Sequence, residues 1–121
     1  MNTPPRSFGH IDVPLIHKAC EFYKKVYLLS FRIPKRDRLG ILAKIEDALM
    51  EIIKLSITAS LAVKTNKFLY LDPIRIKIEV LKNFFRIAYE LDIIRQKTYI
   101  DMELDLQELS KMTSGWIKYL R

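Results

Sequence analysis

The chain has 121 residues, of which 50% are hydrophobic, and a formal net charge of +7 at pH 7. This length favours one domain with a real core, and the single cysteine, Cys20, excludes an intrachain disulfide and fits a reducing cytoplasm. No uncharged apolar run approaches the roughly 20 residues that a membrane-spanning helix needs. The N-terminal MNTPPRSFGH also lacks the apolar region of a signal peptide, so we expect a cytoplasmic protein with no membrane partner.

The first expected helix follows a lead-in rich in proline and glycine. Residues 1–11 are expected to be flexible, and residues 12–121 to form a single domain. Asp12-Val13-Pro14 combines a capping residue with a proline in the first turn, which predicts a helix start. Pro34 predicts its end, because the residue before a proline is pushed out of helical geometry. Between them, apolar residues recur at helical spacing: Leu15, Ala19, Phe22, Val26, Leu29 and Ile33.

The second expected helix has a wide apolar face. Asp37 is expected to cap its start. Two apolar stripes indicate burial on more than one side. The main stripe is Leu42, Ile45, Leu49, Ile52, Ser56, Ala59 and Val63, and the other is Ile41, Ala48, Leu55 and Ala62.

Two further helices complete the pattern. Residues 65–71 are expected to form a connection, after which Asp72-Pro73 repeats the cap-then-proline signal. The third helix carries Ile74, Ile78, Leu81, Phe85, Ala88 and Leu91. After a break near residues 95–97, the fourth carries Tyr99, Met102, Leu106, Leu109, Trp116 and Leu120. Four helices with short connections predict an all-α fold, an antiparallel up-and-down four-helix bundle.

The positive charge is concentrated in the first helix and the turn after it. Between Lys18 and Lys44 the chain has eight basic residues and two acidic ones, whereas the fourth helix has equal numbers of basic and acidic residues. Residues spaced seven apart share a helix face, so basic residues gather on one face of the first helix and one of the third. We interpret these faces and the turn FRIPKRDRLG (31–40) as a continuous phosphate-binding surface. Its candidate residues are Lys18, Lys25, Arg32, Lys35, Arg36, Arg38, Arg75, Lys82 and Arg86. The alternative is that they are the solvated faces of a basic protein.

No catalytic, metal or cofactor site is predicted. His17 and Cys20 lie three residues apart, but zinc needs three or four ligands. The chain has no Glu-x-x-His pair for a di-iron bundle and no glycine-rich phosphate loop. We therefore expect a protein that is not an enzyme.

Gly115 and Trp116 raise a separate question. A glycine inside a helix costs about 1 kcal/mol relative to alanine. A close packing contact at Gly115, with Trp116 inserted between elements, would offset this cost. The neighbour is either another helix of the bundle or another subunit.

Three stretches, taken in order, carry a resemblance to a known family: Phe22 to Lys35, Phe84 to Leu91, and Leu109 to Lys118. They resemble the accessory variability determinant proteins of diversity-generating retroelements, and the similarity covers residues 13–120. The wider relatives of this family are the four-helix-bundle proteins encoded by intervening sequences of 23S ribosomal RNA genes. In this family the ending is more often Gly-Gly-Trp, where this chain has Ser114 in place of the first glycine.

The resemblance implies a small basic bundle that forms a homopentamer and is encoded by a prokaryote or phage. Such a protein would bind the reverse transcriptase and the template RNA, with DNA as a further candidate. It would support mutagenic retrohoming, in which template adenines are copied with errors, without being the polymerase. The alternative is an oligomeric scaffold of the ribosomal intervening-sequence type, with a protein-interaction role.

Overall fold

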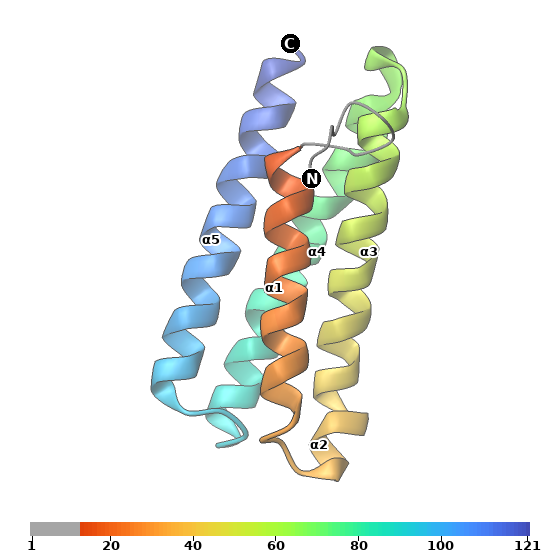
Figure 1. The fold of residues 1–121 in the computed structure, drawn as a ribbon. Coiled ribbons are helices and arrows are strands. Elements are labelled where there is room, and N and C mark those ends of the chain that lie inside the picture. Colours follow the sequence, from red (N-terminus) through yellow and green to blue (C-terminus); the bar gives the residue numbers. More distant parts are fainter. Residues whose placement is uncertain (1–12) are drawn as a thin grey trace, which may run out of the picture.

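The computed structural model describes residues 13–121, so the expected lead-in and the capping residue Asp12 lie outside the described residues. Four long helices fill this range: α1 (Pro14–Ser30), α3 (Ile41–Leu61), α4 (Lys67–Glu90) and α5 (Gln96–Tyr119). A short helix, α2 (Lys35–Leu39), and a 3-10 turn, η1 (Lys64–Asn66), lie in the connections (Figure 1). No strand occurs in residues 13–121.

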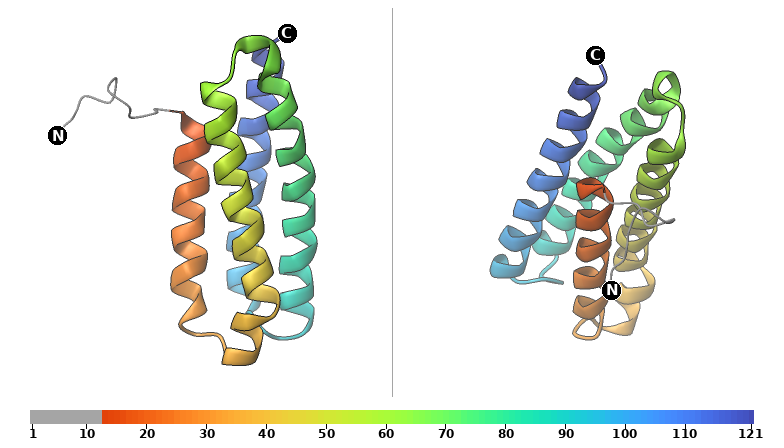
Figure 2. Two further views of the ribbon diagram at one scale, coloured as in Figure 1. Left: turned by 90° about the vertical axis from the view of Figure 1, so that its right-hand side faces the viewer. Right: turned by 45° about the horizontal axis from the view of Figure 1, so that its top comes forward.

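The four long helices form an antiparallel bundle. α1 and α4 each pack against both α3 and α5, so α1 and α4 occupy opposite corners. Each helix runs opposite to its two neighbours (Figure 2). The predicted up-and-down four-helix bundle is therefore confirmed. The α1–α3 and α4–α5 connections meet at one end, and the α3–α4 connection lies at the other (Figure 1).

The core follows the predicted apolar stripes. The rings of Phe22 on α1 and Phe85 on α4 stack across the bundle, with their centroids 6.0 Å apart. Most residues of the four stripes are buried around this pair, and the second stripe of α3 is partly buried, as predicted. Val63 and Leu91 are both 64% exposed, because each lies just beyond the end of its helix.

The start of α3 differs from the prediction. Asp37 does not cap α3 but lies inside α2, whose first turn forms when the amides of Asp37 and Arg38 donate to the Pro34 carbonyl at 3.0 and 2.9 Å. Gly40 precedes α3 and gives no side-chain cap. The predicted cap is therefore wrong, because Pro34 begins a separate helical turn instead of leaving an extended link.

The start of α4 also differs. The helix begins at Lys67 and continues through Pro73, so the predicted connection at residues 65–71 is wrong over most of its length. A proline inside a helix cannot donate to the carbonyl four residues earlier. Burial offsets this loss, because Leu71 is fully buried and Tyr70 packs against the core. The Lys67 ammonium also donates to the carbonyls of Ala59 and Ser60 at 2.8 and 3.1 Å, and so provides hydrogen-bond donors for two carbonyl groups at the C-terminal end of α3.

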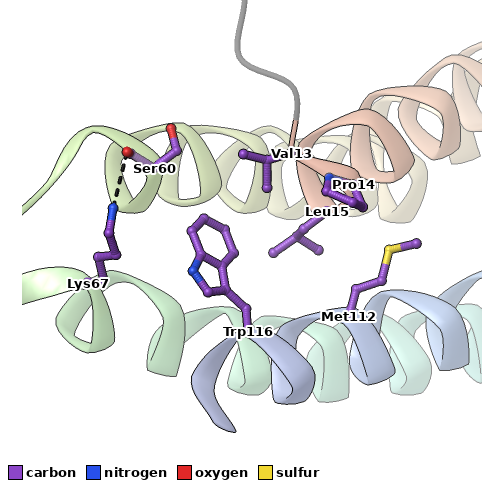
Figure 3. Close-up of a pocket in the computed structure, with 7 residues that line it drawn as sticks. All are labelled: Val13, Pro14, Leu15, Ser60, Lys67, Met112 and Trp116. Carbon is purple, nitrogen blue, oxygen red and sulfur yellow. Dashed lines mark hydrogen bonds between the residues drawn. The ribbon is translucent and has the colours of Figure 1, made fainter. Parts of the chain in front are cut away.

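Gly115 and Trp116 behave differently from each other. A Cβ added at Gly115 would meet no atom of the described residues within 4 Å, so Gly115 makes no close contact with another helix of the bundle, and a contact with another subunit stays a prediction. Trp116 does insert between elements. It lines a pocket of about 520 Å³ with Val13 and Leu15 of the α1 start, Lys67 of α4, and residues of α3 and α5 (Figure 3).

Candidate nucleic-acid interface

Four basic residues follow α1 at one end of the bundle, one in the connection to α2 and three in α2 itself. Arg32, Lys35, Arg36 and Arg38 are all exposed. Within residues 13–121, none of the four forms a salt bridge. Their charges therefore remain available to an anionic ligand.

Two of the lysines predicted to bind phosphate instead form salt bridges with residues of α5. Lys18 lies 2.9 Å from an Asp105 oxygen and 3.0 Å from Glu108, and Lys25 lies 2.5 Å from Asp105 and 2.7 Å from Asp101. These ion pairs span α1 and α5 and hold the two helices together. Lys18 and Lys25 thus have partners inside the bundle that would compete with a phosphate.

The pKa shifts in this network follow from its geometry. Burial acts to raise the pKa of the Asp105 carboxyl, but hydrogen bonds from Lys18 and Lys25 outweigh it and the pKa is lowered. The hydrogen bond to Asp105 raises the pKa of Lys18. Burial acts to lower the pKa of Lys25, but its hydrogen bonds to Asp101 and Asp105 outweigh burial, and the pKa is raised. The Asp105 carboxyl and the ammonium groups of Lys18 and Lys25 are therefore charged near neutral pH.

The cations of α4 lie apart from those of α1. Arg75 bonds to Asp72, and Lys82 lies 3.1 Å from Glu79. Arg86 is exposed, and it has no salt bridge within residues 13–121. Because α1 and α4 occupy opposite corners, the two helix faces do not form one continuous surface. Of the three, Arg86 is nearest the end of α4, one turn before Glu90. That end of α4 lies at the same end of the bundle as α2 (Figure 1).

Two further cations were missed by the sequence reasoning. Arg95 and Lys97 are exposed in and just after the α4–α5 connection, and they line a groove that also contains Arg32. Only the bundle topology places these two cations near the first turn, because in an up-and-down bundle the first and third connections lie at the same end. We define the basic end as Arg32, Lys35, Arg36, Arg38, Arg95 and Lys97. The acidic residues of the two connections are Asp37 and Asp92, so positive charge dominates this end.

No other kind of site emerges from the described residues. Residues 13–121 contain no group of three or more side chains that could hold a metal ion. His17 is exposed, and Cys20 is partly buried. In the same range, every helix is too short or too polar to cross a membrane.

Comparison with known proteins adds one finding. A family model described as bAvd-like matches residues 15–120, which is most of the chain. No curated protein matches the sequence. The family match confirms the resemblance to accessory variability determinant proteins that the sequence predicted, and that family is known as accessory, not catalytic.

Proposed function

The chain belongs to the bAvd-like family, and on that premise we propose that it is a non-catalytic accessory protein of a diversity-generating retroelement. In this role it binds the phosphates of the template RNA through the basic end and also binds the reverse transcriptase. DNA is a second candidate nucleic acid. Through both contacts it supports mutagenic retrohoming.

The observation that carries the proposal is that no residue of the basic end forms a salt bridge within residues 13–121. Phosphate contacts dominate the affinity of most protein–nucleic acid complexes and are largely independent of sequence. Arginine is suited to this role because its guanidinium donates two parallel hydrogen bonds to a phosphate. The proposal therefore rests mainly on Arg32, Lys35, Arg36 and Arg38, with Arg95, Lys97 and Arg86 as nearby additions. Lys18, Lys25, Arg75 and Lys82 are left as weaker candidates because acidic neighbours hold them.

A second surface supports the proposed homo-oligomer, which by family likeness would be a pentamer. Leu69, Ile76, Val80, Ile87 and Leu91 are spaced seven, four, seven and four residues apart and are 38–65% exposed. They form an apolar stripe about 33 Å long on the face of α4 away from the core. Contiguous apolar surface of this kind marks interaction sites in soluble proteins. Seven-four spacing is also typical of helices that pack against another helix.

The proposal is tested by measuring RNA affinity and particle mass together. A fluorescein-labelled single-stranded RNA is titrated with wild type and with R32Q/K35Q/R36Q/R38Q, while light scattering gives the mass of each protein. The matched control, K64Q/K111Q/K118Q/R121Q, removes the same charge from exposed residues away from the basic end.

We expect the first variant to bind RNA at least about tenfold more weakly than wild type, and the control to bind more tightly than the first variant, with the same mass for all three. Equal weakening in both variants would mean that net charge alone attracts RNA. No binding by the wild type would leave the rival function, an oligomeric protein-interaction scaffold of the ribosomal intervening-sequence type.

A further inference from the structure

A groove separates the last turns of α1 from the first turns of α5. It has a volume of about 790 Å³ and opens on the side of the bundle next to the basic end. Its α5 wall runs from Arg95 to Leu104, a length of about 14 Å. This length matches two to three turns of a helix.

The lining of the groove includes exposed aliphatic side chains. Leu28 of α1 is 64% exposed, and Ile100 and Leu104 of α5 are 50% and 59% exposed. Ile100 and Leu104 lie four residues apart on α5, so they share one face. Three large exposed aliphatic side chains around one groove indicate a surface that binds apolar groups of a partner.

The rim of the groove is basic. Arg32, Arg95 and Lys97 line it, and none of them forms a salt bridge within residues 13–121. The acidic residue of the lining is Asp101, which already lies 2.7 Å from Lys25. Within the described residues, the groove therefore combines three cations that have no acidic partner with exposed apolar side chains, and its complement is an occupant that is both acidic and apolar.

We propose that this groove binds an acidic amphipathic helix of a partner protein. The apolar side chains of that helix would cover Leu28, Ile100 and Leu104, while its carboxylates would face Arg32, Arg95 and Lys97. Binding of an amphipathic helix in a groove between two helices is a recurrent mode of peptide recognition. A single-stranded nucleic acid fits less well, because no aromatic side chain of residues 13–121 lines the groove for bases to stack on. Arg32, Arg95 and Lys97 also belong to the basic end, but peptide binding in the groove does not require that the basic end binds RNA.

The test uses a fluorescein-labelled synthetic peptide of about 20 residues with leucines on one helical face and glutamates on the other. A control peptide has the same composition in scrambled order. Fluorescence anisotropy measures the affinity of both for wild type, Leu104→Asp, Arg95→Glu and Leu61→Asp. Leu61 is 73% exposed at the end of α3, outside the groove, and serves as the matched control.

The expected result is that wild type binds the patterned peptide at least about tenfold more tightly than the scrambled one. Leu104→Asp and Arg95→Glu each lose at least about tenfold, and Leu61→Asp binds like wild type. Equal binding of the two peptides, no binding, or equal loss in Leu61→Asp would overturn the proposal.

Two further measurements on Leu104→Asp identify a different occupant. If this variant loses affinity for a uridine oligonucleotide and keeps its affinity for the peptide, the groove belongs to nucleic acid. If its mass by light scattering falls below that of wild type, a second copy of the chain covers the groove. Either result would overturn the proposal, and neither coincides with a failure of the wild type to bind RNA.

Discussion

Replacing Asp105 with asparagine removes a buried carboxylate that contacts both Lys18 and Lys25. Asp105 is 9% exposed, and its two oxygens lie 2.9 and 2.5 Å from the two ammonium groups. Breaking a fully buried ion pair costs about 3–5 kcal/mol, because the remaining charge is left without its partner. Here the lysine side chains keep 22% and 41% exposure, and Glu108 and Asp101 remain in contact with them. We therefore expect Asp105→Asn to lower the free energy of unfolding by about 2 kcal/mol.

Urea denaturation followed by circular dichroism measures this change. With a slope of about 1.5–2 kcal/mol per molar urea for a chain of this size, the midpoint should fall by about 1 M. Protein concentration must be held constant, because the stability of an oligomer depends on it. Glu103→Gln is the matched control, since Glu103 lies on the same helix and forms no salt bridge within residues 13–121. Its midpoint should stay close to that of wild type.

The effect of Asp105→Asn on the free energy of unfolding should depend on pH. The folded pKa of Asp105 is lowered, so the unfolded chain binds the proton more tightly. Its contribution is fully present above the unfolded pKa of about 4 and is lost as pH falls through the folded pKa. The stability difference between wild type and Asp105→Asn should therefore shrink below about pH 4. A difference below about 0.5 kcal/mol at pH 7, or one that persists unchanged in acid, would refute the role assigned to this network.

Three further substitutions test the packing of individual helices, each by urea denaturation. Gly115→Ala should stabilise the protein by about 0.5–1 kcal/mol, since the new methyl group meets open space in a helix; destabilisation would indicate a second subunit packed there. Pro73→Ala should stabilise α4 by about 1–3 kcal/mol, because it restores an amide donor to the Leu69 carbonyl, and a loss of stability would mean that the proline ring is needed for packing. Leu49→Ala should cost about 2–5 kcal/mol, because Leu49 is fully buried; a cost below about 1 kcal/mol would contradict its place in the core.

The fold was predictable because apolar periodicity reports burial directly. Residues such as Phe22, Leu49, Leu81 and Leu106 stand at helical spacing and are all buried. The helix starts were not predictable in the same way. Asp37 and the Asp72-Pro73 pair are local signals for a helix start. In α4, burial of Leu71 outweighs this local signal, so the helix begins earlier, at Lys67.

The candidate site was predictable only in part. The spacing correctly placed Lys18 and Lys25 on one face, but the acidic partners come from α5, which is distant in sequence. Asp101, Asp105 and Glu108 also stand at helical spacing, so the sequence alone predicts that they share one helix face. That this face packs against α1 could be predicted only from the topology of the bundle. Arg95 and Lys97 were missed for the same reason.

The salt dependence of RNA binding tests the central claim most directly, that the basic end binds phosphates. The dissociation constant for a single-stranded RNA is measured over a range of salt concentrations for wild type and for R32Q/K35Q/R36Q/R38Q. Each lost phosphate contact reduces the slope of log K against log salt by about 0.7, so four lost contacts should reduce it by about 3. A slope that is the same in the two proteins would mean that these four side chains do not contact phosphate, and the account of the basic end would be wrong.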